Sequence, residues 1–404
     1  MSARSPAILF ALVAMGLDAL SVGMIIPVVP QLVSSMAGAD PRLASRMLSV
    51  MMSVFAVAQL FAAPVLGGLS DRFGRRKVIL ISITGMAFDF MLMGWAPRLS
   101  WLVVARVLGG LTAASVVSVN AYIADVTPPE KRAQRFGLVG ATIGGAFVLG
   151  PAVGGLLGAV SVRLPFWVAA GLCVLNLLYG LLVLPESLPP ERRRAFDWTR
   201  ANPFSSAKSL LSSPDLTRLG ICWFLTWFGM GAFPVAFLLS ANLRFGWASA
   251  QNGMAIALVG FTQVIVQAFL ARRVVVAVGE VQSARLGYCF TAFATLVYAL
   301  ADHGWMIWCA CVISGCGSLT MPAIRAMVSS MATANRQGEA QGALSAMEGV
   351  AAIVAPLVAG EIFVHFSTHA FFYLPGAPFL LTAAVSLLAV WLMGRVTFMR
   401  ARRV

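Results

Sequence analysis

Long apolar runs separated by short polar loops are the feature that most constrains this chain. Twelve such runs lie at residues 8–33, 47–69, 78–96, 100–123, 136–160, 164–184, 216–240, 250–271, 284–301, 304–328, 343–365 and 371–394. Each is close to the roughly 20 residues that an α-helix needs to cross the hydrocarbon core of a bilayer. Backbone groups inside lipid must pair within their own segment, so the Gly and Pro in these runs do not argue against helices. The sequence predicts an all-α membrane protein with twelve transmembrane helices.

The composition excludes a soluble enzyme and a disordered chain. Hydrophobic residues make up 59% of the sequence and charged residues 11%, whereas a soluble domain is about 25% charged. The net charge of +14 would suggest nucleic acid in a soluble protein. Here the Lys and Arg residues stand in short clusters between apolar runs, so we expect a lipid bilayer and no nucleic acid as partner. The first run is too long for a signal peptide and is kept as a span.

The positions of Lys and Arg predict the orientation of the chain. With the N-terminus in the cytoplasm, most of the 29 Lys and Arg residues fall in cytoplasmic segments, so both termini are predicted to be cytoplasmic. The longest polar stretch, rich in Pro, Arg and Ser, divides the apolar runs six and six. We therefore expect an N-terminal six-helix half at 1–184, a cytoplasmic central linker at 185–215 and a C-terminal six-helix half at 216–404.

A constant offset of 205 residues relates the two halves. It separates Pro151 from Pro356, and it equally separates Gly74 from Gly279. One offset shared by a helix and a loop indicates an internal duplication. Two pseudo-symmetric halves around a midplane site are an architecture of transporters.

The loop after the second apolar run carries a long motif. Residues 67–77 read Gly-Gly-Leu-Ser-Asp-Arg-Phe-Gly-Arg-Arg-Lys, which resembles the G-x-L-x-D-R-x-G-R-R loop of the major facilitator superfamily. An aspartate here can meet a helix N-terminus or a cation, and the arginines can meet carboxylates or lipid phosphates. We expect Asp71, Arg72, Arg75 and Arg76 to form a cytoplasmic latch with Asp125, which ends the fourth run. The alternatives are a generic basic loop and a solvated carboxylate at a helix end.

The fifth run resembles the antiporter motif of the same superfamily, G-x8-G-x3-GP-x2-GG. It supplies Gly150, Pro151, Gly154 and Gly155, with Ala146 in place of the central glycine. Small residues permit close helix contact and the Gly-Pro pair permits a kink. Within the superfamily the motif is associated with efflux, and the alternative is a glycine-rich helix packed against lipid.

Three charged residues lie deep within apolar runs. Asp18 lies near the midplane, and Asp89 and Arg106 lie at similar depths below the outer surface. Charged groups inside a membrane are costly and usually face a cavity or a partner. We expect Asp18 and Asp89 to take protons or to hold a cationic substrate, with Arg106 tuning their pKa values. A static ion pair that fixes helix packing is the alternative.

Other polar and aromatic residues within the runs are weaker candidates. Those that could bind substrate are Gln59, Asn120, Trp227, Phe233, Gln263 and Gln267. Interhelical hydrogen bonding is the alternative for the amides, and plain packing is the alternative for the aromatic residues. Arg325 and Glu348 are predicted to form a local ion pair near the cytoplasmic surface, with Glu348 as a second proton carrier the alternative. The Cys and His residues lack metal-ligand spacing, so no metal site is expected.

Nearly the whole chain resembles the tetracycline/proton antiporters of Gram-negative bacteria. The resemblance is carried by the Asp18 segment, the Asp71 loop, Asp89, Arg106 and residues 121–125, 184–187, 321–323 and 336–338. It implies an inner-membrane exporter that exchanges a drug–metal complex for protons. It also implies functional roles for Asp18, Asp89, Arg106, Asp71 and Arg75, with Gln59 at the substrate site. The second half departs from the family, because residues 288–295 lack its carboxylate, with Thr291 near that place, and Gln263 lies near its missing histidine.

We therefore expect a proton-coupled efflux transporter that exports tetracycline-like or other amphipathic antibiotics from the cytoplasm by alternating access. An exporter of a sugar or other metabolite and a non-transporting membrane sensor stay open as alternatives. We expect a monomer in the bacterial inner (plasma) membrane with no enzymatic activity. The proton gradient takes the place of a cofactor, and a divalent cation is expected to accompany a tetracycline substrate.

Overall fold

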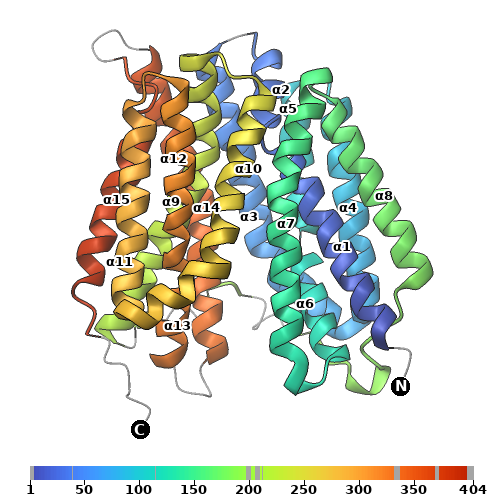
Figure 1. Cartoon of the computed structure of the whole chain (residues 1–404). Helices are drawn as coiled ribbons and strands as arrows, with labels where there is room; N and C mark the ends of the chain where they lie inside the picture. Colours follow the sequence, from blue (N-terminus) through green and yellow to red (C-terminus); the bar gives the residue numbers. More distant parts are fainter. Residues whose placement is uncertain are drawn as a thin grey trace. The chain divides into compact units, whose positions relative to one another are not determined.

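Every regular element is a helix in the residues that the computed structural model of the protein describes (Figure 1), which are 4–38, 40–113, 115–196, 202–204, 210–211, 213–331, 337–368 and 373–397. No strand occurs within those ranges. Nine helices there are long and apolar enough to cross a membrane, and Leu99–Thr112 and Ala377–Met393 are shorter apolar helices. Each of the twelve apolar runs contains a helix, so the predicted all-α membrane fold is confirmed.

The chain forms two compact units. The first consists of Met1–Asn202 with Trp247–Ala257, and the second of Pro203–Gly246 with Leu258–Val404. The break after Asn202 falls inside the stretch 185–215 that we predicted to be a linker. Residues 247–257 come from the second half of the sequence, and they group with the first unit because glycines let them approach its helices closely.

The helices of the first unit pack against one another in pairs. Its helices are α1 (Arg4–Ile25), α2 (Val29–Met36), α3 (Pro41–Phe73), α4 (Arg75–Trp95), α5 (Leu99–Thr112), α6 (Ser115–Val126), α7 (Pro129–Val160), α8 (Leu164–Val183) and the short 3-10 turn η1 (Pro190–Arg192). α1 packs against α7 and α8, and α4 packs against α8 and α5. The core between them is formed by large buried side chains such as Phe10, Tyr122 and Phe166.

The second unit repeats this pairing. Its helices are α9 (Pro214–Phe245), α10 (Ser249–Ile265), whose first turns belong to the first unit, the π-helical turn η3 (Val266–Leu270), α11 (Ala271–Leu300), α12 (Gly304–Cys316), the 3-10 turn η4 (Gly317–Leu319), α13 (Thr320–Met331), α14 (Gln337–Thr368) and α15 (Ala377–Met393). α9 packs against α14 as α1 packs against α7, and α11 packs against α15 as α4 packs against α8. The helix pairs therefore follow the duplication that the sequence predicts.

Local conformation follows the same 205-residue offset. Gly74 and Gly279 both have positive φ, at 100° and 83°, in a region that favours glycine because it has no Cβ. Gly110 and Gly315, also 205 residues apart, are both places of close approach between helices. A Cβ at Gly110 would lie 2.4 Å from the Phe55 carbonyl oxygen, and one at Gly315 would lie 2.5 Å from the Thr262 Cβ. The second helix of each half therefore approaches the fourth at an equivalent glycine.

Candidate functional site

The carboxylate of Asp18 is buried in the first unit beside an amide. The residue is 7% exposed, and its Oδ1 accepts a hydrogen bond from Asn176 Nδ2 at 3.0 Å. The same Nδ2 donates to the Ala14 carbonyl at 3.2 Å. Among the described residues, the buried Asn176 Oδ1 has no hydrogen-bond partner. An amide that presents both a donor and a free acceptor can bind an ionised or a protonated carboxyl group.

Asp89 and Arg106 form a buried ion pair between α4 and α5. Both side chains are nearly excluded from solvent, at 3% and 13% exposed, and the guanidinium also lies over the Phe55 ring at 5.3 Å. Gly109 makes room for the pair, since a Cβ there would lie 2.5 Å from Asp89 Oδ2. The structure thus brings together the two residues that the sequence placed at one depth.

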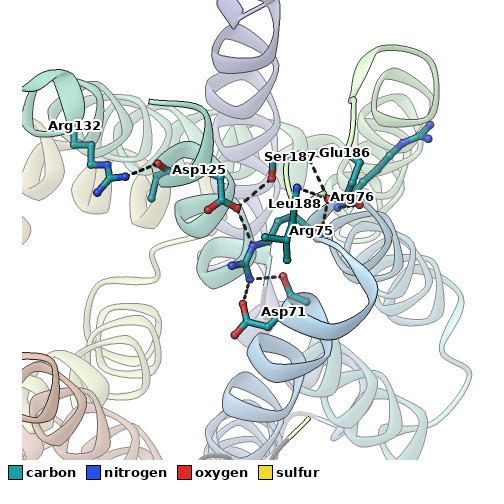
Figure 2. A network of polar contacts seen from close by, with 10 residues as sticks. Asp71, Arg75, Arg76, Asp125, Arg132, Glu186, Ser187 and Leu188 are labelled. Atoms are coloured by element: carbon teal, nitrogen blue, oxygen red, sulfur yellow. Dashed lines mark hydrogen bonds and ion pairs between the residues drawn. The ribbon is translucent and has the colours of Figure 1, made fainter. Parts of the chain in front are cut away.

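Three of the predicted latch residues, Asp71, Arg75 and Asp125, meet at the end of α3 (Figure 2). The Arg75 guanidinium binds Asp71 Oδ1 at 2.5 Å and Asp125 Oδ2 at 3.1 Å, and it also donates to Ser70 Oγ at 3.0 Å. Arg75 therefore joins α4 to the ends of α3 and α6 within the first unit. Arg72 takes a different place, with its guanidinium 5.0 Å from the Phe73 ring centre.

A second acid, Glu186, caps α4 at the same place (Figure 2). Its carboxylate accepts from the backbone N–H groups of Arg75 at 2.8 Å and Arg76 at 3.3 Å, and also from those of Ser187 and Leu188. A carboxylate at a helix N-terminus satisfies free N–H groups and complements the helix dipole. The Arg76 guanidinium donates to the Leu181 carbonyl at 2.7 Å. The capping role of Glu186 was missed, because no periodic signal links a residue after one helix to the start of another.

The glycines of the fifth apolar run bring backbones together within the first unit. A Cβ at Gly154 would lie 1.9 Å from the Met24 carbonyl oxygen, and one at Gly150 would lie 2.9 Å from the Gly23 Cα. On another face of α7, a Cβ at Gly155 would lie 2.5 Å from the Ser249 carbonyl oxygen. Pro151 lies inside α7 between these contacts. The motif residues therefore hold α7 close to α1 and to the first turn of α10.

The second unit contains a cavity of about 210 Å³ between α9, α10, α11, α15 and the α12–α13 segment. Three of the predicted substrate residues, Phe233, Gln263 and Gln267, line it. No acidic or basic side chain is among its lining residues, all of which belong to the described part of the chain. This cavity is neutral, in contrast to the buried charges of the first unit.

Hydroxyl groups dominate the wall of the cavity that α11 provides. Tyr288, Thr291, Thr295 and Tyr298 all line it, and their spacing of three, four and three residues places them on one helix face. The sequence analysis named Thr291 only as the place of a missing acid and overlooked the other three. Their helical spacing was the signal that could have found them.

The remaining predicted substrate residues do not line this cavity. Gln59 is exposed on α3, and Asn120 on α6 has a buried Oδ1 without a hydrogen-bond partner among the described residues. Trp227 lies on α9, edge-on to the Trp223 ring at 6.3 Å.

Glu348 and Arg325 form the predicted ion pair in the second unit, with an aromatic partner. Glu348 Oε1 accepts from Arg325 Nη2 at 3.4 Å and from Trp223 Nε1 at 3.1 Å. The Arg325 guanidinium lies 5.0 Å from the Trp223 ring centre, within the range of a cation–π contact. Arg325 is 54% exposed, so this pair lies in a wetter place than Asp89 and Arg106.

Known proteins are similar to this chain in sequence and in fold. The family model of the Major Facilitator Superfamily matches residues 11–318 and 219–402. The class C tetracycline resistance protein of Escherichia coli is 36% identical over 86% of this chain and 87% of that protein. The class G protein of Vibrio anguillarum is 33% identical over 88% of this chain and 89% of that protein.

Solved structures of more distant sequence show the same fold. The nucleoside transporter NupG (D323A mutant) superposes with a TM-score of 0.80 at 14% identity, over 97% of this chain and 100% of that chain. The human organic anion transporter MFSD10 gives 0.70 at 23% identity, over 96% and 99%. The chain is a multi-pass membrane protein and belongs to the Major Facilitator Superfamily.

Proposed function

We propose that this chain exports tetracycline-like antibiotics from the bacterial cytoplasm in exchange for protons, by alternating access. Identity of 36% to a tetracycline resistance protein over most of both chains supports the cargo class. The buried Asp18 carboxylate beside the Asn176 amide is the observation that carries the proton coupling. The transporter works as a monomer in the inner membrane with both termini in the cytoplasm, and it is not an enzyme.

Asn176 makes both protonation states of Asp18 acceptable inside the protein. The ionised carboxylate accepts from the amide N–H, as in the structure. After protonation, the new O–H donates to the amide oxygen once the amide turns, and that oxygen is the atom that now lacks a partner. An unsatisfied buried polar group costs about 1–3 kcal/mol. The amide lowers this cost in both states, so a proton can load and leave.

Asp89 and Arg106 form the second coupling element. Protonating Asp89 removes its charge and leaves the Arg106 cation buried without its counter-ion, which is strongly unfavourable. That imbalance drives a rearrangement in which water, or an anionic group on the cargo, reaches Arg106. The pair thus converts a proton into a change of contacts between α4 and α5.

The driving force suits the export of a drug. A membrane potential supplies about 2.3 kcal/mol per charge per 100 mV, and a pH difference supplies about 1.4 kcal/mol per unit. At 100 mV and one pH unit, these sum to about 3.7 kcal/mol for each proton, if the exchange is electrogenic. That energy sustains a roughly 500-fold cargo gradient. No resident cofactor takes part, and a divalent cation travels as part of a tetracycline complex.

Transport by inside-out membrane vesicles tests the proposal. Vesicles with an acidic interior are expected to accumulate tetracycline, and a protonophore abolishes the accumulation. Asp18→Asn is expected to remove gradient-driven uptake while the variant reaches normal levels in the membrane. Normal uptake by Asp18→Asn refutes the coupling role. A panel that adds a phenicol, a cationic dye and a sugar separates drug export from metabolite export, and no flux of any compound indicates a sensor.

A further inference from the structure

Most of the serine and threonine hydroxyl groups that line the cavity of the second unit donate their hydrogens to backbone carbonyls. Thr291 donates to the Gly287 carbonyl at 3.0 Å, and Thr295 donates to the Thr291 carbonyl at 2.8 Å. Thr226, Thr382 and Ser386 likewise donate to carbonyls one helical turn back. A hydroxyl has one hydrogen and two lone pairs. Each of these oxygens therefore keeps lone pairs that can accept a hydrogen bond.

The hydroxyl of Tyr288, on the same face of α11, also donates its hydrogen to a backbone carbonyl. The Tyr288 hydroxyl donates to the Cys222 carbonyl at 2.6 Å and also lies 2.6 Å from the Thr226 hydroxyl, so these two groups are partly engaged with each other. Donors are fewer in the described lining, and they include the amides of Gln263 and Gln267 and the hydroxyl of Ser318, which is buried without a hydrogen-bond partner. The cavity therefore matches a guest that brings more hydrogen-bond donors than acceptors.

Aromatic rings form another part of the wall. The Tyr298 and Phe379 rings lie 5.1 Å apart, and Phe233 meets Phe379 edge-on at 6.2 Å. Aromatic pairs prefer offset or edge-to-face contact, so this cluster favours a planar ring as a further member. The absence of charged lining residues disfavours an ion. The volume of about 210 Å³ is below the roughly 300–1,000 Å³ of pockets for whole drug-sized ligands, so the cavity encloses only part of such a molecule.

We propose that this cavity binds the hydroxyl-bearing aromatic edge of the cargo, taking phenolic or enolic O–H groups onto its threonine and tyrosine oxygens. The inference rests on the proposed function in one respect, because it takes the compound bound in the cavity to be the transported cargo. It assigns the recognition of uncharged polar groups to the second unit. It also gives Thr291 and Thr295, in the helix where the resembling family carries an acid, a role that needs no charge.

Binding of two matched probes tests this assignment. We would measure 2,3-dihydroxynaphthalene and 2,3-dimethoxynaphthalene by equilibrium dialysis against the full chain in detergent, without a proton gradient. The two share a ring system, and only the diol has O–H donors. The diol is expected to bind at least fivefold more tightly. Thr291→Val and Thr295→Val are each expected to weaken diol binding about 3- to 10-fold and dimethoxy binding less than twofold.

Two further variants control for folding. Thr84→Val removes a hydroxyl that donates to its own helix at 2.8 Å on α4, in the other unit, and should leave both affinities unchanged. Thr291→Ser keeps the hydroxyl and should keep diol affinity within about twofold. Equal affinity for the two probes overturns the inference, as does unchanged diol binding in both valine variants.

The inference and the proposed function fail separately. Asp18→Asn is expected to retain diol binding while losing export, because Asp18 belongs to the other unit. Diol binding that follows this pattern in a protein that exports no tetracycline upholds the cavity assignment and defeats the proposed cargo. Tetracycline export without selective diol binding upholds the proposed cargo and defeats the cavity assignment.

Discussion

The two duplicated halves keep the same helix pairing but different chemistry inside. By the 205-residue offset, Ala294 is the equivalent of Asp89 in the second half, and Cys311 is the equivalent of Arg106. Both Ala294 and Cys311 are fully buried. The fold thus packs the same two helices with an ion pair in one half and with small neutral residues in the other.

This difference indicates why the charges are present. Replacing a buried ion pair by apolar groups is often neutral or stabilising, and the second half shows that this helix packing works without one. The comparison therefore supports the proposed coupling role of the pair over static packing. We read the first half as the place of proton coupling and the second as the place of neutral recognition.

The largest expected effects on stability and export come from replacing Asp89 and Arg106 by the neutral residues of the second half. Arg106→Cys alone leaves Asp89 buried without its cation and should lower the free energy of unfolding by about 3–5 kcal/mol. The double variant Asp89→Ala/Arg106→Cys should recover most of that loss, because it copies the second half. Reversible denaturation in detergent measures both variants. Export should be abolished in both.

A double variant that exports normally contradicts the comparison, because the charges would then do nothing that Ala294 and Cys311 do not. A double variant as unstable as Arg106→Cys shows instead that the pair is structural. Asp89→Asn serves as the control that removes the charge while keeping the side-chain shape, and it should also lose export.

The antiporter motif offers a second contrast between the halves. Gly154 has Ala359 as its counterpart, yet a Cβ at Gly154 would meet the Met24 carbonyl oxygen. Gly154→Ala should therefore lower the free energy of unfolding by about 1–3 kcal/mol through overpacking. Gly145→Ala is the control on the same helix, since nothing lies within 4 Å of its added Cβ. Helix propensity should make that control neutral or slightly stabilising. Equal destabilisation by the two changes would remove the close approach as the cause.

The network of Asp71, Arg75 and Asp125 has no equivalent at the matching residues of the second half. Asp71, Arg75 and Asp125 correspond to Val276, Glu280 and Ser330, so the second half cannot form the same pairs. The loop geometry alone is shared, through the positive φ of the glycine that precedes Arg75 and Glu280. The two halves therefore share the turn, whereas the charged residues around it differ.

Glu186→Ala probes the capped side of this network. It removes the acceptor for four backbone N–H groups at the start of α4 and after α8, and should lower the free energy of unfolding by about 1 kcal/mol. Glu191→Ala, in the short turn η1, is the control. Faster hydrogen exchange at Arg75 and Arg76 should accompany the loss. Unchanged exchange there would show that the cap is not needed.

Sequence reasoning succeeded where a single residue or a local motif carries the signal. Hydropathy gave the spans, equal depth gave the Asp89–Arg106 pair, and the loop motif led to the contact between Arg75 and Asp125. It failed where a residue outside any motif contacts a distant residue across the fold. Asn176 binds Asp18 although the two residues are 158 positions apart in the sequence. An amide side chain in an apolar run usually forms an ordinary interhelical hydrogen bond, so it gave no signal of this contact. The hydroxyl cavity was missed for the same reason, since Ser and Thr are common in membrane helices.

Glu348→Gln has the smallest expected effect and tests the comparison most directly. The amide keeps an oxygen that can accept from Trp223 Nε1, now at 3.1 Å, and loses only the attraction to the largely exposed Arg325. Exposed ion pairs contribute about 0–1 kcal/mol, so export should fall less than threefold. Asp18→Asn in the same vesicles is the matched loss of a carboxylate in the first half. If Glu348→Gln lost export as completely as Asp18→Asn, proton coupling would extend into both halves, and the division between a charged half and a neutral half would be wrong.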